Sequence, residues 1–275
     1  MYARSSVPYR HLWAVENLSS ADIRELLDTA RRLRAAMRDS QAGTPLRGRN
    51  LALLNDAAPA EGAGSLRHAA VGLGAQVSHL RPSEARLSAA DAATARLLGR
   101  LYDAIDCEDM PAALVAEVAR EAGVPVFNGL GGARHPTRVL AELLAIQERS
   151  GKALDTLSLR FVGDPGSACG AALLRAAAAC GIELRIAAPR DRWPPPELWE
   201  ALKAGAVARG GRLHLFESAA QAGEDSDVTL DGAGDPPWPF TARGAAPRAD
   251  ECDEPDERSS YREAALQAML VAAIS

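Results

Sequence analysis

Groups that could carry out chemistry are sparse in this sequence. A turn with three glycines runs from Gly163 to Gly170, between a predicted strand and a predicted helix, which is the context in which a dinucleotide phosphate binds. Its glycines follow the spacing GxxGxxxG instead of GxGxxG, and no acidic residue ends the next strand. The only two lysines, Lys152 and Lys203, stand in no context that suggests Schiff-base chemistry. The sequence therefore disfavours a dinucleotide site and offers no clear covalent catalyst.

The histidines and cysteines are not spaced as metal ligands. The five histidines form no HxH or HxxxH pair, and the four cysteines form no CxxC pair. We interpret the cysteines as free thiols, and we expect neither a metal nor an organic cofactor. The cysteines are Cys107, Cys169, Cys180 and Cys252, and the histidines are His11, His68, His79, His135 and His214.

Composition and charge narrow the class of partner. A chain of 275 residues suits two domains of ordinary size, and 47% apolar with 24% charged residues is typical of a globular protein. A net charge of −5 without a basic block argues against nucleic acid and anionic membranes as partners. No apolar run approaches the roughly eighteen residues of a membrane span, and the first residues lack a signal-peptide core. We therefore expect a cytoplasmic protein.

Hydrophobic periodicity predicts a regular alternation of strands and helices. Ser19 and Asp22 form a capping box, which predicts a helix over 19–38. In the first half, strands are predicted at 51–54, 75–80, 103–105 and 124–127, and helices at 66–73, 89–101, 111–122 and 136–147. In the second half, strands are predicted at 157–162, 182–188, 212–216 and 227–230, and helices at 167–180 and 195–209. A loop rich in proline, glycine and acid over 232–257 precedes a final helix over 259–274.

This alternation predicts an α/β fold class. Strands that alternate with helices form parallel sheets through right-handed crossovers. We predict two doubly wound parallel-sheet domains joined by a helix, with the C-terminal helix packing back on the first domain. The predicted domains are residues 1–150 and residues 151–275.

Several stretches resemble the aspartate/ornithine carbamoyltransferase family, and ornithine carbamoyltransferase most closely. The most specific is His135-Pro136-Thr137, followed by the helical run 140–148. Further matching stretches lie at 73–77, 82–83, 94–98, 102–105, 123–130, 161–164 and 185–189. The resemblance implies a first domain like those that bind carbamoyl phosphate, and a second like those that bind the amino acid. Members of the family transfer a carbamoyl group from carbamoyl phosphate to an amine, as trimers with shared active sites.

The phosphate motif of that family is absent from this chain. Relatives carry Ser-Thr-Arg-Thr-Arg at a helix N-terminus, where this sequence has Pro59-Ala60-Glu61-Gly62-Ala63. Both hydroxyls and both arginines are lost. A negative charge at Glu61 would repel a phosphate by about 3 kcal/mol per unit charge at about 5 Å and an effective dielectric constant near 20. A simpler interpretation, that Pro59 and Glu61 merely start a helix well, stays open.

The rest of the implied site is partly altered, so the chain resembles a divergent member that lacks most active-site motifs. Glu108 stands where relatives place an arginine that holds the carbamoyl oxygen, which is a second charge reversal. His135 would polarise a carbonyl by hydrogen bonding. Arg138 replaces the usual glutamine and could pair with Glu108 or Glu61. We predict His135 and Arg138 as catalytic residues, and as substrate-binding residues Glu61, Glu108, Thr137, Asn128 and Asp231.

Three functions stay open at this point. The losses favour a degenerate ornithine-carbamoyltransferase-like protein, unable to use carbamoyl phosphate in the usual way and acting as a binding, regulatory or assembly partner. A second hypothesis is an enzyme whose acidic site was rebuilt for another, cationic or neutral substrate. A third is a true carbamoyltransferase acting on an amino-acid amine, with arginines supplied from elsewhere in the chain. As partners we expect a small amino-acid-like ligand and a homo-oligomer, a trimer by resemblance, or a hetero-assembly with an intact paralogue.

Overall fold

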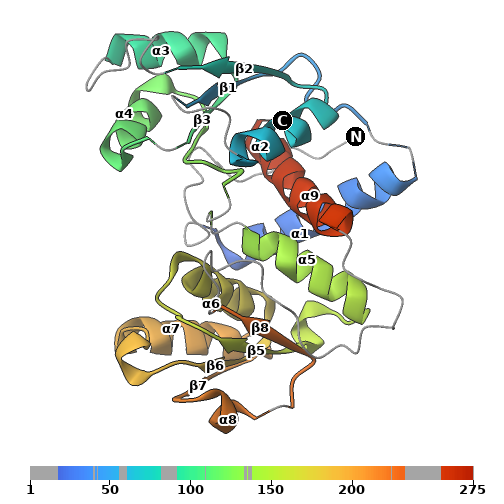
Figure 1. Cartoon of the computed structure of the whole chain (residues 1–275), viewed down its shortest axis with the longest axis vertical. Coiled ribbons are helices and arrows are strands. Elements are labelled where there is room, and N and C mark those ends of the chain that lie inside the picture. Colours follow the sequence, from blue (N-terminus) through green and yellow to red (C-terminus); the bar gives the residue numbers. More distant parts are fainter. Residues whose placement is uncertain are drawn as a thin grey trace. The chain divides into compact units, whose positions relative to one another are not determined.

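Two parallel four-stranded sheets with flanking helices form the protein, as predicted from the sequence (Figure 1). The computed structural model describes residues 18–39, 41, 43–55, 61–81, 92–108, 110–132, 135, 138–223, 225–232 and 255–274. The described residues separate into two compact units, one made of 29–135 and 263–274 and the other of 18–28 and 136–262. The domain limits expected from the sequence stay a prediction.

The first sheet has the strand order β2-β1-β3-β4, with all neighbours parallel. Since β2 lies on one side of β1, and β3 and β4 lie on the other, the direction of winding reverses between β1 and β3. The strands are β1 (Asn50–Leu54), β2 (Gln76–Leu80), β3 (Ala104–Cys107) and β4 (Val126–Phe127). The connecting helices are α2 (Glu61–Gly72), α3 (Ala92–Leu101) and α4 (Ala112–Ala122).

The central strands of this sheet are buried on both faces. Every residue of β3 and all but the first of β1 are buried, which explains why both strands are nearly continuous apolar runs. The prediction that β3 ends at residue 105 is wrong, because the strand continues through Asp106 and Cys107 beside Leu53 and Leu54. An acidic residue such as Asp106 usually indicates a loop. Here Asp106 lies within the strand, and its carboxylate accepts a hydrogen bond from the backbone N–H of Leu130 at 2.9 Å.

The second sheet is also four-stranded and parallel, but its strand order, β7-β6-β5-β8, differs from that of the first. Its strands are β5 (Ser158–Val162), β6 (Glu183–Ala187), β7 (Arg212–Phe216) and β8 (Val228–Asp231). Its helices are α6 (Ala168–Cys180), α7 (Pro196–Val207) and α8 (Ala219–Ala222), with single 3₁₀ turns at η2 (Leu154–Thr156) and η3 (Arg190–Arg192). The sequence did not predict α8, η2 or η3, because each is too short to show a periodicity.

Local sequence signals fix the helix ends as expected. Helix α1 (Ser20–Arg38) opens with the predicted capping box. Asp22 Oδ2 accepts from the backbone N–H of Ser19 at 2.7 Å, and Ser19 Oγ accepts from that of Asp22 at 3.2 Å. Helix α6 ends at Gly181, whose φ of +72° and contact with the carbonyl oxygen of Arg209 leave no room for a Cβ atom.

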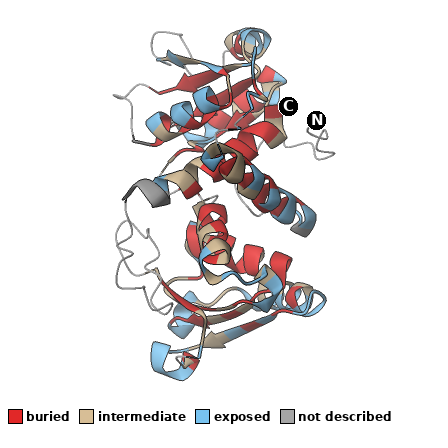
Figure 2. Cartoon of the chain, turned by 90° about the vertical axis from the view of Figure 1, so that its right-hand side faces the viewer, coloured by how far each residue is buried: buried red, intermediate tan, exposed pale blue. Residues whose placement is uncertain are grey.

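Two further helices complete the chain. Helix α5 (Arg138–Ser150) belongs to the second unit, and α9 (Pro255–Ile274) ends the described residues. The last part of α9 groups with the first unit, where Glu263 Oε2 lies 3.5 Å from His68 Nε2 on α2, so the predicted return of this helix is confirmed. From Tyr261 onward α9 is mostly buried (Figure 2).

Most of the loop predicted over 232–257 falls on residues 233–254, which lie outside the described residues. Its predicted end at 257 is wrong, because α9 begins at Pro255. No helix in the described part of the chain is long and apolar enough to cross a bilayer.

Candidate functional site

The first candidate site lies where β1 and β3 end. Ligands of open α/β sheets bind beyond the carboxyl ends of the strands at the point where the winding reverses, and in the first sheet that point lies between β1 and β3. Asn55 directly follows β1 and Glu108 directly follows β3. Both side chains are buried, and Asn55 Nδ2 donates to Glu108 Oε2 at 3.2 Å. A polar pair of this chain therefore occupies the usual ligand position.

The carboxylate of Glu108 also lies against the first turn of α2. A Cβ atom built on Gly62, the second residue of that helix, would overlap Glu108 Oε1. The backbone N–H groups of a first helical turn have no partner within the helix, and they form the positive end of its dipole. A carboxylate near this place is therefore favourable, and helix N-termini are also places at which proteins bind phosphate groups.

A glycine-rich turn closes this arrangement from the other side. A Cβ atom on Gly131 would overlap the carbonyl oxygen of Gly62, and one on Gly62 would lie 2.9 Å from the backbone nitrogen of Gly132. The turn itself is held by the bond from the Gly132 N–H to the Gly129 carbonyl at 2.8 Å. Only glycine allows the start of α2 and this turn to approach so closely, so residues 129–132 are fixed beside the Glu108 carboxylate.

Asp106 anchors the same turn from inside the sheet. Its side chain is 2% exposed, and the backbone N–H of Leu130 donates to its Oδ1 at 2.9 Å. Burial raises the pKa of Asp106 to about 7, and the charge of Glu108 acts in the same direction, while the hydrogen bonds from Leu130 and Gly129 lower it. Burial and the nearby charge of Glu108 therefore both disfavour the ionised form of Asp106.

His135 lies at the end of this unit and is buried. Its backbone N–H donates to the carbonyl of Gly132 at 3.1 Å, so it continues the same turn. Burial lowers the pKa of the imidazole to about 4, which keeps the ring neutral at neutral pH. A neutral imidazole can donate one hydrogen bond to a carbonyl, as the predicted role requires, and that role stays a prediction.

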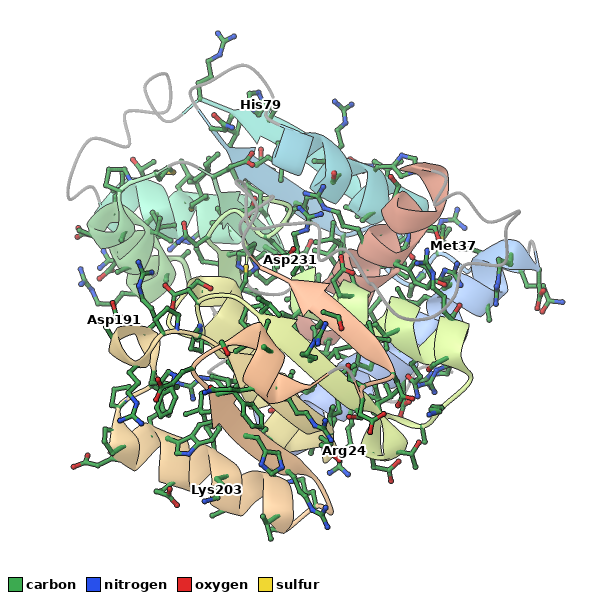
Figure 3. All side chains as sticks on the ribbon, turned by 60° about the horizontal axis from the view of Figure 1, so that its bottom comes forward. Arg24, Met37, His79, Asp191, Lys203 and Asp231 are labelled. Carbon is green, nitrogen blue, oxygen red and sulfur yellow. The ribbon has the colours of Figure 1, made fainter. Side chains whose placement is uncertain are left out.

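The other predicted site residues are spread over both units. In the first, Glu61 is the first residue of α2, and Asn128 is exposed just after β4. In the second, Arg138 opens α5, and Asp231 ends β8 at the winding reversal of the second sheet (Figure 3). Thr137 lies outside the described residues. The structure brings Glu108 to the start of α2, where Glu61 stands, and the predicted pairing of Arg138 with either acid stays a prediction.

Sequence reasoning missed Asn55 and the role of Asp106. Both lie at the carboxyl ends of strands that are adjacent in the sheet, and a polar residue directly after or within a buried strand is the signal that could have identified them. Among the residues that the structure describes, no three histidine, cysteine or acidic side chains are grouped as a metal site.

The contact between Glu108 and α2 predicts opposite effects for two alanine substitutions in one helix. Gly62→Ala should lower the free energy of unfolding by about 1–3 kcal/mol, because the new methyl group displaces the Glu108 carboxylate and the backbone of Gly132. The matched control, Gly64→Ala, meets no atom within 4 Å and should raise it by about 0.5–1 kcal/mol through helix propensity. Denaturant unfolding measures both. Equal effects would contradict the placement of Glu108.

The raised pKa of Asp106 predicts a pH-dependent stability. Because the folded state holds a proton up to about pH 7 that the unfolded chain releases near 3.8, stability should fall as the pH rises through this window. The asparagine of Asp106→Asn cannot ionise, so the free energy of unfolding of this variant should not decrease over this pH range. Near pH 8 it should exceed that of the native chain by at least about 1 kcal/mol.

Asp103→Asn is the control for that measurement, because Asp103 is half-buried at the edge of the same strand and pairs with Arg49 at 2.8 Å. The free energy of unfolding of Asp103→Asn should decrease with rising pH as that of the native chain does. A native chain of constant stability between pH 5 and pH 8 would contradict the burial argument, and pH-dependent chemical denaturation decides the matter.

The chain resembles known carbamoyltransferases in sequence. Residues 10–148 match the family model of the aspartate/ornithine carbamoyltransferase carbamoyl-phosphate-binding domain. Over 210 residues the chain is 36% identical to the catabolic ornithine carbamoyltransferase of Pseudomonas putida, which covers 76% of this chain and 62% of that protein. The chain therefore spans less than two thirds of that relative's length.

Solved structures share the fold. The ornithine carbamoyltransferase of Pyrococcus furiosus superimposes with a TM-score of 0.77 at 23% identity and covers 99% of both chains. An aspartate transcarbamoylase from Trypanosoma cruzi, in complex with aspartate and phosphate, gives 0.75 at 19% identity, covering 100% of this chain and 99% of that one. Given the match of the family model over half of the chain, this protein belongs to the aspartate/ornithine carbamoyltransferase family.

Proposed function

We propose that this chain is a family member that does not use carbamoyl phosphate in the usual way, and that it acts as a binding, regulatory or assembly partner. The single observation that carries the proposal is the Glu108 carboxylate at the first turn of α2, held by the amide of Asn55. The chain supplies its own anion at the position where a phosphate would be bound.

The negative charge of Glu108 disfavours the binding of a phosphate at the start of α2. A phosphate about 5 Å from the Glu108 carboxylate would be repelled by about 3 kcal/mol per unit charge at an effective dielectric constant near 20. The attraction of the helix N-terminus, worth about 0.3–2 kcal/mol, is too small to offset this repulsion. Phosphate binding therefore needs cations that outweigh the local acids.

Those cations are missing from the sequence around the turn. Residues 56–64, which lead from β1 into α2, contain no arginine, lysine, serine or threonine, and they add the acids Asp56 and Glu61. Asp106 lies buried close behind Glu108. Together these acids favour a neutral or cationic group over a dianion such as carbamoyl phosphate.

The ligand that we propose is a small amino-acid-like molecule. In this proposal Asp231, at the winding reversal of the second sheet, holds its ammonium group. Substrate-binding roles for Glu61, Glu108, Asn128 and Thr137 stay predictions from the sequence. The neutral imidazole of His135 and the guanidinium of Arg138 can each donate hydrogen bonds to a carbonyl or carboxylate, and their catalytic roles stay predictions.

Calorimetric titration of the full chain with carbamoyl phosphate at low salt tests the proposal. We expect no heat and no thermal stabilisation at millimolar ligand. Binding at tens of micromolar or tighter, roughly −6 kcal/mol, would overturn the proposal, because other cations would then have rebuilt the phosphate site. Release of phosphate from carbamoyl phosphate in the presence of ornithine would also overturn the proposal. True carbamoyl transfer would then be the favoured function.

A charge-neutral variant shows whether Glu108 is the cause. Glu108→Gln keeps the size of the side chain and can still bond to Asn55, but it removes the negative charge at α2. Inorganic phosphate should raise the melting temperature of this variant more than that of the native chain. Glu121→Gln, whose carboxylate pairs with Arg96 on the α3–α4 surface, removes the same charge elsewhere and should respond like the native chain. An equal response of all three proteins would show that Glu108 does not block the site.

A further inference from the structure

The second sheet has helices of very different length on its two faces. The chain passes from β5 through β6 to β7 in one direction and then returns beyond β5 to β8. Right-handed crossovers therefore place α6 and α7 on one face and α8 on the other (Figure 1). Helices α6 and α7 have 13 and 12 residues, whereas α8 has four. Because both faces of a parallel sheet are normally covered by helices, the face under α8 is only partly covered.

The strand residues on the two faces differ in the same way. The face under α6 carries buried apolar side chains such as Leu159 and Phe161 on β5. The opposite face, which we call the α8 face, alternates with them and carries Arg160 on β5 and Arg185 on β6. Contacts with the end of α8 confirm this assignment, because Arg160 Nη1 donates to the carbonyl of Gly223, and a Cβ atom on Gly223 would lie 3.8 Å from Arg185 Nη1.

Basic side chains form a row across the α8 face. The strand register places Arg160 on β5 beside Arg185 on β6, and Arg185 beside His214 on β7. Arg212 lies two residues before His214 on β7, and therefore on the same face. Like charges directly opposite each other on neighbouring strands destabilise a sheet. Folding alone therefore gives no reason for this row, and binding of an acidic group does.

Arg160 has a structural role within this row. Its Nε donates to Thr229 Oγ1 on β8 at 3.2 Å, and its Nη1 donates to the Gly223 carbonyl. The carbonyl groups at the end of a helix have no partner within the helix, so Arg160 satisfies one of them and fixes the end of α8. Arg160 is therefore not available to a partner.

The other basic residues of the row are available. Arg185 pairs with Glu183 at 3.1 Å on its own strand, and its side chain is 27% exposed. Arg212 and His214 are exposed on β7, which is the edge strand of the sheet. Within the part of the chain that the structure describes, neither of them has an acidic partner. The positive charge of this part of the α8 face therefore exceeds that of its acid.

Apolar side chains border the basic row. The strand register places Val162, Ala187 and Phe216 in one line, two residues beyond the row on β5, β6 and β7. Helix α8 contacts β6 and β7 and covers part of this line, but Phe216 stays only half-buried. Its ring stacks on that of His214, with the ring centroids 6.3 Å apart. The surface thus offers an apolar group directly beside cations.

This combination fits an acidic protein segment better than nucleic acid. A phosphate backbone has no apolar side, and the whole chain carries a net charge of −5, which repels a polyanion. An amphipathic helix has apolar residues on one side and can carry acids next to them. A second copy of the chain bound through the same face is disfavoured, because the two basic rows would face each other.

We propose that the open part of the α8 face, formed by Arg185, Arg212, His214 and Phe216, binds an acidic amphipathic helix of a partner protein. The occupant is a helix because helices cover the faces of parallel sheets, and α8 is too short to cover this one. Its carboxylates form charge-assisted bonds with the two arginines, and its apolar residues pack on Phe216. This inference rests on the assembly role proposed above and names the surface and the chemistry of the partner.

Fluorescence anisotropy with the full chain and a labelled peptide tests the proposal. The probe is a peptide of three Leu-Ala-Glu-Leu-Ala-Glu-Ala repeats, which forms an acidic amphipathic helix. The native chain should bind it at low salt, and binding should weaken as salt is added. Arg185→Gln combined with Arg212→Gln should weaken binding at least about tenfold, because both charged contacts are lost. Arg96→Gln combined with Arg120→Gln changes the net charge equally on the α3–α4 surface and should bind like the native chain.

A charge reversal separates recognition from loss of structure. Arg185→Glu combined with Arg212→Glu should lose the acidic peptide and gain a matched peptide in which lysine replaces every glutamate, a gain that requires a folded face. No binding of the acidic peptide by the native chain, an equal loss in the Arg96→Gln and Arg120→Gln control, no gain of the lysine peptide, or tighter binding of single-stranded oligothymidylate would overturn the proposal. The carbamoyl phosphate titration probes the first unit, so either experiment can fail while the other succeeds.

Discussion

The contact between Glu108 and the first turn of α2 is the constraint on which the first unit depends. It requires Gly62 in the helix, Gly131 and Gly132 in the facing turn, and Asn55 at the end of the neighbouring strand. Asp106, one pleat earlier on the same strand, holds the turn from below through Leu130. Replacement of any member exposes either an unpaired helix end or a buried carboxylate, so these positions stabilise one another.

The strands of the two sheets differ in their pattern of burial. In the first, β1 and β3 are buried along nearly their whole length, as expected of parallel strands covered on both faces. In the second, β5 and β6 alternate: Leu159, Phe161, Leu184 and Ile186 are buried, while their neighbours are half-exposed until the end of β6. One face of the second sheet therefore carries polar residues such as Arg160, which donates to Thr229 Oγ1 at 3.2 Å on the adjacent strand.

These patterns explain which features could be predicted from the sequence. Strand and helix positions follow local signals, such as the capping box at Ser19 and the apolar run of β1, and they were found within a few residues. The pair at the candidate site joins residues far apart in the chain, since Asn55 and Glu108 are separated by 53 positions. No local pattern encodes such a pair, and strand order alone brings its members together. Asp106 was missed as a strand residue because a backbone donor 24 positions away makes its burial tolerable.

Under the proposed function, the charge reversals at the first site are better explained as stabilising replacements than as random loss. A helix N-terminus that has lost its phosphate ligand keeps unpaired N–H groups and a positive potential in a buried place, which is unfavourable. Random loss of the arginines would leave that cost in place, whereas a carboxylate from β3 removes it and stabilises the fold without a ligand. A site that must bind and release a ligand cannot be satisfied internally, because functional sites are kept at some expense of stability. Under the proposed function, the Glu108 carboxylate beside α2 is the arrangement expected of a scaffold that does not have to make room for an anion.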